Sequence, residues 1–439
     1  MVLIRATALL VLALAWTAHA PAHAAVFNPR THTLDNGLQV IVVENPRAPV
    51  VLHMLWYKVG AADEPAAHAG LAHFFEHMMF KGTNADPDMD FSATVAALGG
   101  EDNAFTGRDF TAFFQTLHPA RLPDVMRMEA ARMTDLEMDA DDIRVEKGVV
   151  TQERAQTSVA TPEDRWQEAM DAAFYGQHPY ARPVIGWNDT IASYTHDVMN
   201  EFYQAHYAPN NAVLVVSGDV RATDVFALAE NIYGPLSARA VPPRVRTGEW
   251  PTGPIRLQQT DKDVRQPQLE WRWHAPALRT APRDAAALQV LMAMVNMPDN
   301  VLQTELVKRR KLAVAVDASY NDAQYDTSAV TLTVTPAPKQ DLTTLEKALT
   351  TTWHKALAGA TDTDLQRAKR LLLESATLAR DNIYAPAYAF GLTIATGGTL
   401  ADVENWPDAI SSVTVADIRR VAGTLQTPPD MAAQLIGTR

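Results

Sequence analysis

The chain has 439 residues, and at roughly 150 residues per domain this length indicates two or three domains. Hydrophobic residues make up 47% and charged residues 20%, which is ordinary for globular proteins and excludes a largely disordered chain, a collagen and a coiled-coil rod. The chain has no cysteine, which excludes disulfides, thiolate catalysis and iron–sulfur clusters, and its net charge of −13 argues against a nucleic-acid partner.

The first 24 residues are predicted to be a signal peptide. Arg5 is the only charged residue before position 29, and Ala6–Trp16 is hydrophobic apart from Thr7. Ala22-His23-Ala24 then fits the small-x-small rule for cleavage. The hydrophobic run is too short to cross a bilayer core of about 30 Å. A buried N-terminal helix is the alternative, but the charge, the run and the cleavage site together indicate export to the periplasm without a membrane span.

The N-terminal half shows alternating strand and helix patterns. Thr31–Leu34 and Leu38–Val43, joined by Asp35-Asn36-Gly37, predict a β-hairpin with a primed turn. Further strands are predicted at Val50–Val59, Thr111–Leu117 and Asn211–Ser217. Helices are predicted at Gly70–Phe80, Phe91–Leu98 and Asp139–Ala155, the last with Asp139 as its N-cap.

A proline-rich stretch separates the two halves of the chain. Few helices or central strands tolerate the proline density between residues 235 and 254. Residues 235–255 are therefore interpreted as a linker between an N-terminal domain, 25–234, and a C-terminal domain, 256–439. Strands are expected after it at Ile255–Gln259, Gln268–Trp273, Ala313–Tyr320 and Ala329–Thr335. Helices are expected at Pro282–Met297, Asn300–Arg310, Asp341–Leu357 and Asp362–Asp381.

The ends of the two halves show the same order of elements. Ser193–Asp219 aligns with Ser412–Thr438 at a fixed offset, and both run from an amphipathic helix through a proline turn into an apolar strand. The aligned identities are Ser193/Ser412, Thr195/Thr414, Pro209/Pro428 and Gly218/Gly437. Many α+β domains end in this way, but the shared order favours a duplication. We therefore expect an α+β fold of two homologous α/β-sandwich domains, each a mostly antiparallel sheet with helices packed on it.

The strongest chemical signal is the segment His73-Phe74-Phe75-Glu76-His77. If it is helical, His73 and His77 lie one turn apart on the same face. Two imidazoles at this spacing can bind one metal ion, and Glu76 beside them can accept the proton of a metal-bound water. The order H-x-x-E-H is that of the inverted zinc peptidases. The alternative is a helix that carries two histidines and a glutamate by coincidence.

Two imidazoles leave a catalytic zinc one protein ligand short. The predicted helix at 139–155 offers Glu146 and Glu153, which are two turns apart and share a face. The pattern alone does not choose between them, and a glutamate on a helix is usually just solvated. Histidine and carboxylate ligands in this combination suit zinc best.

The segment Gly70–Thr83 closely resembles the signature of the pitrilysin or insulinase family of zinc peptidases. Further resemblances lie at Gly99–Gly100 with Asn103–Thr106, at His178–Gly186, and at Tyr207–Asn211. They cover nearly all of the chain after the signal peptide. The length is similar to that of the short branch, which includes mitochondrial processing peptidase subunits and bacterial relatives. The resemblance implies a fold that forms half of a clamshell peptidase.

The resemblance also implies roles for individual residues. It implies that Glu153 is the third zinc ligand, beside His73 and His77. Glu146 corresponds to a carboxylate that supports the site without binding the metal, as groups behind a ligand often do. Asn103 and Ala104 correspond to an edge strand on which the family lays an extended peptide, with main-chain hydrogen bonds holding the substrate. For Asn103, a turn after the two glycines is the alternative.

The chain departs from the family pattern in its second half. Val307 and Val314 stand where the family usually supplies an Arg and, seven residues later, a Tyr. In the family this pair binds substrate near the scissile carbonyl and stabilises the developing oxyanion, a contribution of about 3 kcal/mol. The resemblance therefore implies a heterodimer, in which this chain holds zinc and a homologous partner supplies Arg and Tyr. A homodimer is the alternative where that partner is missing.

The sequence thus predicts an exported zinc endopeptidase that hydrolyses unfolded peptides in a chamber. Glu76 is the expected general base, and we expect weak activity, or none, without the partner subunit. A non-catalytic scaffold and a peptide-binding subunit of the same fold are the alternatives. The complete H-x-x-E-H motif favours the enzyme, because scaffolds of this fold commonly carry degenerate motifs.

Overall fold

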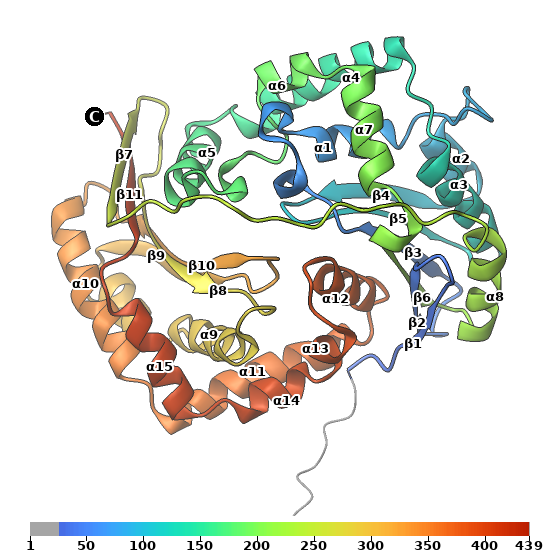
Figure 1. Ribbon diagram of the computed structural model, residues 1–439. Helices are drawn as coiled ribbons and strands as arrows, with labels where there is room; N and C mark the ends of the chain where they lie inside the picture. The colour runs from blue at the N-terminus through green and yellow to red at the C-terminus, as the bar shows by residue number, and fades with distance from the viewer. Residues whose placement is uncertain (1–25, 439) are drawn as a thin grey trace, which may run out of the picture.

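The computed structural model describes residues 26–438, and the predicted signal peptide, residues 1–24, lies outside this range. The chain forms two β-sheets with helices packed on both faces of each (Figure 1). The predicted α+β class is confirmed. Among the described residues, no helix has the length and apolar character needed to cross a membrane.

The first sheet has six strands in the order β1-β2-β6-β3-β5-β4. Only the β2–β6 pair is parallel, and the other neighbours are antiparallel. The strands are β1 Arg30–Thr33, β2 Gln39–Glu44, β3 Val51–Tyr57, β4 Glu101–Thr106, β5 Thr111–Leu117 and β6 Ala212–Gly218. Every residue of β3 and β6 is buried, because helices cover both faces of the sheet at its centre. β4 lies at the edge.

The second sheet has five strands in the order β7-β11-β8-β10-β9. Its strands are β7 Ile255–Asp261, β8 Gln268–Pro276, β9 Ala313–Tyr320, β10 Thr327–Pro336 and β11 Met431–Gly437. Again a single pair, β7–β11, is parallel. The order therefore matches β2-β6-β3-β5-β4 of the first sheet, strand for strand.

The repeat predicted at the ends of the two halves is present in the structure. Helix α7, His196–His206, leads into β6, and helix α15, Val415–Leu425, leads into β11. The bounds of α7 and α15 differ by the same offset as those of β6 and β11. The aligned threonines, Thr195 and Thr414, both cap their helices with the side-chain hydroxyl. This agreement in sequence, capping and topology supports two homologous domains.

Each sheet has one face covered mainly by helices of its own half. Phenylalanine, methionine and branched side chains of α1, α3, α7 and α8 form the core on one face of the first sheet. Helices α9, α10, α11 and α15 do the same for the second sheet. The remaining helices of the first half are α1 Leu71–Met78, α2 Phe91–Ala97, α3 Leu122–Thr134, α4 Ala140–Glu153, α5 Pro162–Tyr175, α6 Asn188–Ser193 and α8 Ala222–Ile232. Those of the second are α9 Pro282–Val295, α10 Leu342–Ala358, α11 Asp362–Ala379, α12 Tyr384–Ala395, α13 Leu400–Glu404 and α14 Trp406–Ser412.

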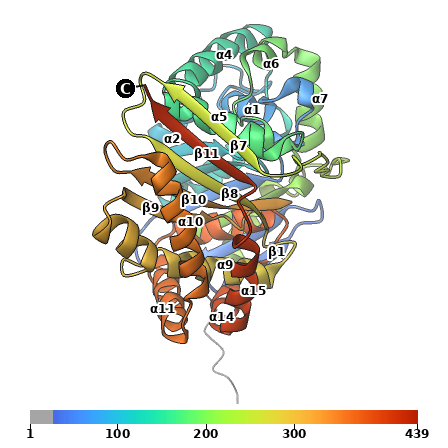
Figure 2. The same ribbon diagram turned by 90° about the vertical axis from the view of Figure 1, so that its left-hand side faces the viewer.

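The other face of each sheet is covered by a helix from the opposite half of the chain. Helix α12 packs on β3 and β6 of the first sheet, and α5 packs on β7 and β11 of the second (Figure 1 and Figure 2). The α12 contact is close because Gly391 lies directly against Trp56. A Cβ at Gly391 would lie 1.9 Å from Trp56 Nε1, so this position accepts no side chain without moving the helix.

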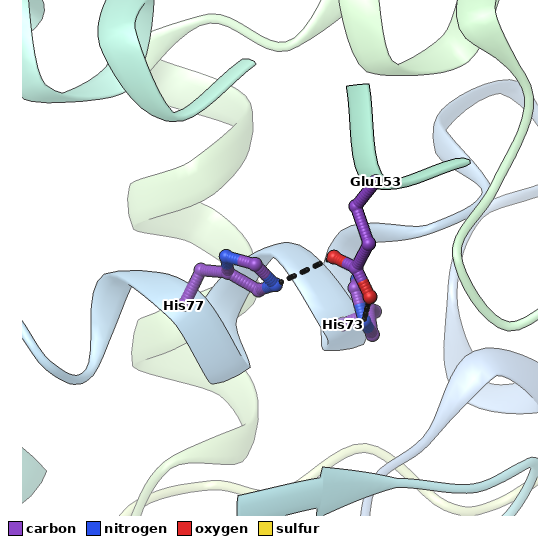
Figure 3. Close-up of side chains that lie close together, drawn as sticks. All are labelled: His73, His77 and Glu153. Carbon is purple, nitrogen blue, oxygen red and sulfur yellow. Dashed lines mark ion pairs between the residues drawn. The ribbon is translucent and has the colours of Figure 1, made fainter. Parts of the chain in front are cut away.

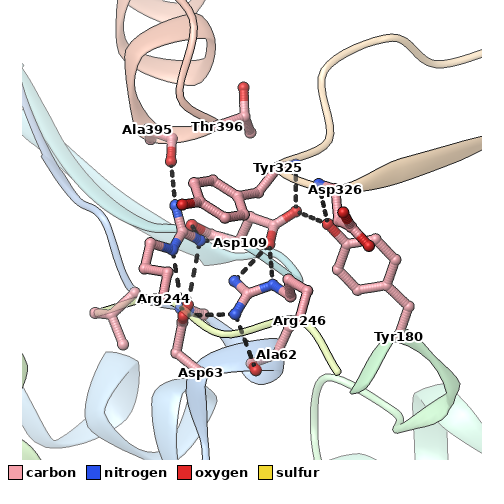
Figure 4. A network of polar contacts seen from close by, with 12 residues as sticks. Ala62, Asp63, Asp109, Tyr180, Arg244, Arg246, Tyr325, Asp326, Ala395 and Thr396 are labelled. Carbon is pink, nitrogen blue, oxygen red and sulfur yellow. Dashed lines mark hydrogen bonds and ion pairs between the residues drawn. The ribbon is translucent and has the colours of Figure 1, made fainter. Parts of the chain in front are cut away.

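The segment 233–254 has no helix or strand and is largely exposed, but the side chains of two of its arginines are buried. Arg244 and Arg246 project from it into a buried cluster with Asp63 and Asp109 (Figure 4). Arg246 contacts Asp63 Oδ1 at 2.8 Å and Asp109 Oδ1 at 2.7 Å. Asp109 also accepts a hydrogen bond from the backbone N–H of Tyr325, which belongs to the second half. The cluster therefore ties the β4–β5 turn to the linker and to the second half.

One local prediction is wrong, and one predicted helix is present in an unexpected form. The hairpin turn at Asp35-Asn36-Gly37 is not a primed turn, because neither Asp35 nor Asn36 has a positive φ. Gly37 N–H donates to Leu34 O, and Gly37 alone has a positive φ, of 89°, as expected for a type I turn followed by a glycine bulge. The expected helix at Asn300–Arg310 is π-helical over Gln303–Arg309.

Candidate metal centre

The predicted metal-binding segment forms the short helix α1, whose first turn is held from outside. Gly70 precedes it with φ 99°, and a Cβ there would lie 2.6 Å from Ile185 O, so glycine is required. The carboxyl group of Glu64 accepts hydrogen bonds from Gly70 N at 2.6 Å and from Ala72 N at 2.7 Å. It thus replaces the N-cap side chain that glycine lacks. Burial raises the pKa of Glu64 to about 8, although both hydrogen bonds oppose this rise.

The last turn of α1 is held by a buried arginine. Arg132 Nη1 donates to Met79 O at 2.8 Å, and the guanidinium lies over the rings of Phe91 and Phe113. Arg132 is paired with Glu129, and both side chains are almost completely buried. A cation at this end complements the negative end of the helix dipole. Both ends of the eight-residue helix are therefore fixed by buried ionisable side chains.

One face of α1 builds the core, and the other carries the chemistry. Phe74, Phe75 and Met78 are fully buried against the first sheet and α7. His73 and His77 lie on the opposite face with their ring centroids 4.9 Å apart. This arrangement follows from the helical spacing, since residues four apart share a face.

Helix α4 brings the third predicted ligand to the two histidines. Its last residue, Glu153, lies with Oε2 3.1 Å from His77 Nε2 and with Oε1 3.7 Å from His73 Nε2 (Figure 3). Ligand atoms of all three residues lie within 4.8 Å of one another. The next residue, Arg154, is buried and contacts both oxygens of Glu168, at 2.8 and 2.9 Å, which fixes the end of α4.

Glu146 lies behind the histidines and is not brought into the ligand group. It accepts a hydrogen bond from His77 Nδ1 at 2.8 Å and pairs with Lys81 Nζ at 2.9 Å. An acceptor at Nδ1 holds the imidazole so that Nε2 faces Glu153 with its lone pair free. The two glutamates that the sequence left as alternatives for the third ligand therefore occupy different places.

Glu76 lies on the same helix and faces the edge strand β4. Its Oε2 accepts a hydrogen bond from Thr106 Oγ1 at 2.6 Å, which leaves Oε1 without a hydrogen-bond donor among the described residues. Burial raises the pKa of Glu76, while the Thr106 hydrogen bond and the charge of His77 oppose the rise. A carboxylate with a raised pKa is a stronger base than one in water.

The pKa values of the two histidines are shifted in opposite directions. Burial lowers the pKa of His73 to about 4, and the neighbouring His77 acts in the same direction, so His73 is neutral at pH 7. Burial alone would lower the pKa of His77, but the hydrogen bond and charge of Glu146 outweigh it and raise the pKa. For Glu146, burial opposes the contacts with His77 and Lys81, which prevail and lower its pKa.

The donor set fits a divalent zinc ion. Zinc in a tetrahedral site has bonds of about 2.0–2.2 Å, which places neighbouring donor atoms about 3.4 Å apart. The His–Glu153 separations of 3.1 and 3.7 Å bracket that value. Glu153 Oε2 is buried and makes no hydrogen bond, so a cation between it and the imidazoles would satisfy it.

The edge strand β4 carries the two residues predicted to bind substrate. Asn103 and Ala104 pair with Phe114 and Phe113 of β5 on one side only. Within the described residues, no strand pairs with the other side of β4. Ala104 N–H donates instead to the side-chain oxygen of Asn103, at 2.8 Å. The outer edge therefore presents backbone groups that an added strand could use.

Comparison with known proteins relates the chain to one protein family. Residues 39–187 match the family described as Insulinase (Peptidase family M16), and residues 193–372 match the family described as Peptidase M16 inactive domain. Zinc protease PqqE of Helicobacter pylori is 31% identical over 308 residues, which are 68% of this chain and 68% of that protein. This chain belongs to the insulinase family. Its relatives are named as zinc proteases, so the coarse prediction of a metallopeptidase is confirmed.

Solved structures of insulinase-family proteins show the same architecture. A protease from Helicobacter pylori has a TM-score of 0.84 at 25% identity, covering 93% of this chain and 99% of that one. The first half of the periplasmic protease PqqL from Escherichia coli has a TM-score of 0.81 at 20% identity, covering 95% and 93%. The whole of PqqL is covered to 48%. The chain thus has the fold of one half of a clamshell peptidase.

The second domain of this insulinase-family chain has neither the metal motif nor the Arg/Tyr pair at the expected place. Val307 is partly buried against the second core, and Val314 is 52% exposed on the edge strand β9. The nearby tyrosines are engaged elsewhere. Tyr320 donates its hydroxyl to Pro276 O, and the ring of Tyr325 is covered by arginines, including Arg244 at 4.2 Å.

Sequence reasoning missed the residues that hold the metal helix and the base. Glu64 and Arg132 cap the ends of α1, Lys81 holds Glu146, and Thr106 holds Glu76. Lys81 and Thr106 lie within the segments that resemble the family, so the resemblance could have identified them as candidates. Glu64 and Arg132 lie outside any motif, and only the fold brings them to the helix.

Proposed function

We propose that the protein is an exported zinc endopeptidase that hydrolyses unfolded peptides laid along strand β4. The observation that carries this proposal is the convergence of His73, His77 and Glu153 on one small volume beside Glu76. The first 24 residues supply the export signal in this proposal, which would place the enzyme in the periplasm.

His73, His77 and Glu153 would hold the metal, with Glu146 orienting His77. When bound there, zinc would supply a Lewis acid that polarises the scissile carbonyl and lowers the pKa of a water molecule. Arg154 and the caps of α1 keep the three ligands in place without binding the metal themselves.

Glu76 would move the proton. Its Oε2 is held by Thr106, so Oε1 is the oxygen placed to accept a proton from the attacking water. The hydroxyl so formed bonds to the carbonyl carbon, and the carbon–nitrogen bond breaks. Glu76 then returns its proton to the departing amine nitrogen, which balances the hydrolysis. The raised pKa that burial gives Glu76 helps it retain the proton between the two steps.

Strand β4 would hold the substrate main chain. Its outer edge is unpaired in the described residues, and α1 contacts β4 next to it. A peptide added there gains main-chain hydrogen bonds that are independent of its sequence, which favours unfolded segments over folded ones. Asn103 would release Ala104 N–H to such a peptide.

A partner chain would complete the catalytic chamber. This chain has the fold of one half of PqqL, and the side chains of Val307 and Val314 offer no donor for an oxyanion. We propose a heterodimer with a homologous subunit that supplies Arg and Tyr, with a homodimer as the second possibility. The isolated chain is then expected to have low peptidase activity, since such oxyanion donors stabilise the transition state by about 3 kcal/mol.

The test is zinc-dependent cleavage by the purified chain with any co-encoded homologue. Glu76→Gln should retain zinc, measured by elemental analysis, and lose cleavage by a factor of a hundred or more. Glu374→Gln, on the exposed surface of α11, is the matched control and should change neither. Bound peptide without new termini, unaffected by chelation or by Glu76→Gln, would instead support a peptide-binding subunit or scaffold of the same fold.

A further inference from the structure

A cavity of about 750 Å³ lies beside the start of the metal helix, and we call it the linker cavity. Its walls come from the loop before α1, from the end of α5, from α7 and from the linker. The metal ligands His73 and Glu153 line a second cavity, and Glu76 and His77 line a third. The linker cavity therefore lies outside the proposed catalytic centre, although its volume is typical of a site for a small molecule.

The linker cavity has buried apolar walls and an exposed apolar mouth. Leu71, the first residue of α1, and Phe202 of α7 are buried. Val245 of the linker and Trp187 line the same cavity and are 56% and 36% exposed. The arginines on both sides of Val245 are fixed in the buried ionic cluster, so Val245 is held in place at the surface (Figure 4). Apolar side chains gathered around a cavity favour a ligand with an apolar body.

The acidic side chains around the linker cavity already have partners or are solvated. Asp63 is paired with Arg244 and Arg246. Both carboxyl oxygens of Glu64 accept hydrogen bonds from backbone N–H groups at the start of α1. Glu201 is exposed at the rim. Among these carboxylates, a cationic ligand would therefore find only the solvated Glu201.

Hydrogen-bond donors, in contrast, are left over. Arg182 lies in the segment His178–Gly186, which resembles the family but supplies neither a metal ligand nor the base. Its half-buried guanidinium donates to three backbone carbonyls, of which Glu64 O is the closest at 2.8 Å. Within the described part of the chain it forms no ion pair, so two of its five N–H groups remain free. The ring nitrogens of His206 also have no hydrogen-bond partner among the residues that the structure describes.

We infer that the linker cavity binds a small monocarboxylate carried on an apolar body. The carboxylate takes the free N–H groups of Arg182, with His206 as a second donor, because hydrogen bonds to a charged group are the stronger ones. The apolar body lies against Leu71 and Phe202 and is covered by Val245 at the mouth. Aliphatic acids and the carboxyl termini of short apolar peptides share this chemistry.

The linker cavity shares its walls with the metal helix. Leu71 belongs to α1, and Phe202 stacks on Phe75 of the same helix with ring centroids 5.7 Å apart. Arg182 holds the backbone of Glu64, whose carboxyl group caps α1. A ligand that orders these contacts stabilises α1 in its metal-binding conformation. It would then raise the affinity for zinc, and zinc would raise the affinity for the ligand by the same factor.

The first experiment is a calorimetric titration of the metal-free full chain with sodium octanoate and, as a control of opposite charge, with octylamine hydrochloride. We expect octanoate to bind and octylamine to bind about tenfold more weakly or less. Arg182→Gln removes the charge and should weaken octanoate binding about tenfold to a hundredfold. Arg182→Lys keeps the charge and should bind octanoate more tightly than Arg182→Gln does.

Val245 provides a test that does not disturb folding, because its side chain is exposed. Val245→Asp brings a like charge to the mouth and should weaken octanoate binding about fivefold, whereas Val245→Lys should strengthen it. Opposite effects of two substitutions at one surface position do not arise from misfolding. Leu371→Asp, at a residue of α11 that is 49% exposed, is the matched control and should leave octanoate binding unchanged.

Competition distinguishes the two sources of the carboxylate. Displacement of bound octanoate by the peptide Ala-Ala-Phe, but not by its amide, would assign the site to peptide carboxyl termini as well. Octanoate binding that the peptide leaves unchanged would assign it to aliphatic acids. The inference is overturned if octanoate does not bind, if octylamine binds as tightly, or if neither Val245 variant changes its affinity.

The link to the metal helix has its own measurement. Zinc affinity, measured by competition with a chromogenic chelator, should rise in the presence of octanoate, and this rise should be absent in Arg182→Gln. Equal zinc affinity with and without octanoate would refute the link. Octanoate binding is measured without metal and without peptide cleavage, so its failure would leave the proposed endopeptidase function standing.

Discussion

The buried arginine at the end of the metal helix gives the sharpest test of how the site is held. Arg132→Met keeps the length of the aliphatic chain and removes the guanidinium. The change leaves Glu129 as an unpaired buried carboxylate and leaves Met79 O without its donor. Gln115 still donates to Glu129 at 2.7 Å, but it carries no charge.

The expected cost follows from the burial of this pair. The side chains of Arg132 and Glu129 are 1% and 0% exposed, so no solvent screens the charge that remains. Removing one partner of a buried pair costs about 3–5 kcal/mol, whereas replacing both with apolar side chains of similar size is often neutral. We therefore expect Arg132→Met to be severely destabilising and Arg132→Met with Glu129→Leu to recover most of the loss.

Urea unfolding followed by tryptophan fluorescence measures the free energy of unfolding of the single and the double variant without metal. Zinc titration of each folded variant measures its affinity for zinc. Because the double variant still lacks the donor to Met79 O, its stability should recover more fully than its zinc affinity. A single variant that loses less than about 1 kcal/mol, or a double variant no more stable than the single one, would refute this account of the pair.

Three further results are expected. Glu146→Gln weakens the hold on His77 Nδ1 and should lower zinc affinity about tenfold to a hundredfold, measured by competition with a chromogenic chelator; unchanged affinity would contradict the orienting role. Burial raises the pKa of Glu64 to about 8, so the free energy of unfolding should fall as the pH rises from the ordinary pKa of a glutamate through 8. Glu64→Gln should remove this part of the pH dependence, measured by urea titrations of both chains at each pH. Identical slopes of unfolding free energy against pH for the two chains would contradict this expectation. Gly391→Val places atoms inside the indole of Trp56 and should lower Tm and expose tryptophan, whereas Gly423→Ala, which meets nothing within 4 Å, should not.

Local pattern was sufficient wherever neighbouring residues decide the structure. The spacing of His73 and His77 fixed their common face, and Asp139 was recognised as the cap of α4. The repeat of α7–β6 as α15–β11 was visible from a handful of aligned residues. These signals depend on helical and strand periods, which are properties of the chain itself.

Contacts between residues that are far apart in the sequence could not be predicted from local patterns. Spacing alone left Glu146 and Glu153 equivalent, and only the packing of α4 on α1 gives one to the ligand group and the other to His77 Nδ1. Nothing near Glu64 in the sequence indicates that it caps α1, because the loop that returns it to the helix is set by tertiary contacts. The prediction of a primed turn failed for a local reason, because a hairpin loop of three residues, rather than two, favours a type I turn followed by a glycine bulge.

The crossing of α5 and α12 has a consequence for how the molecule can be divided. A cut in the linker would strand α12 with the wrong sheet and expose Trp56 and the apolar strands around it to water, and the loss of α5 would do the same on the other side. Neither fragment should be soluble alone, while co-expressed fragments should reassemble. The two repeats therefore cannot be separated, because each supplies the helix that covers an apolar sheet face of the other.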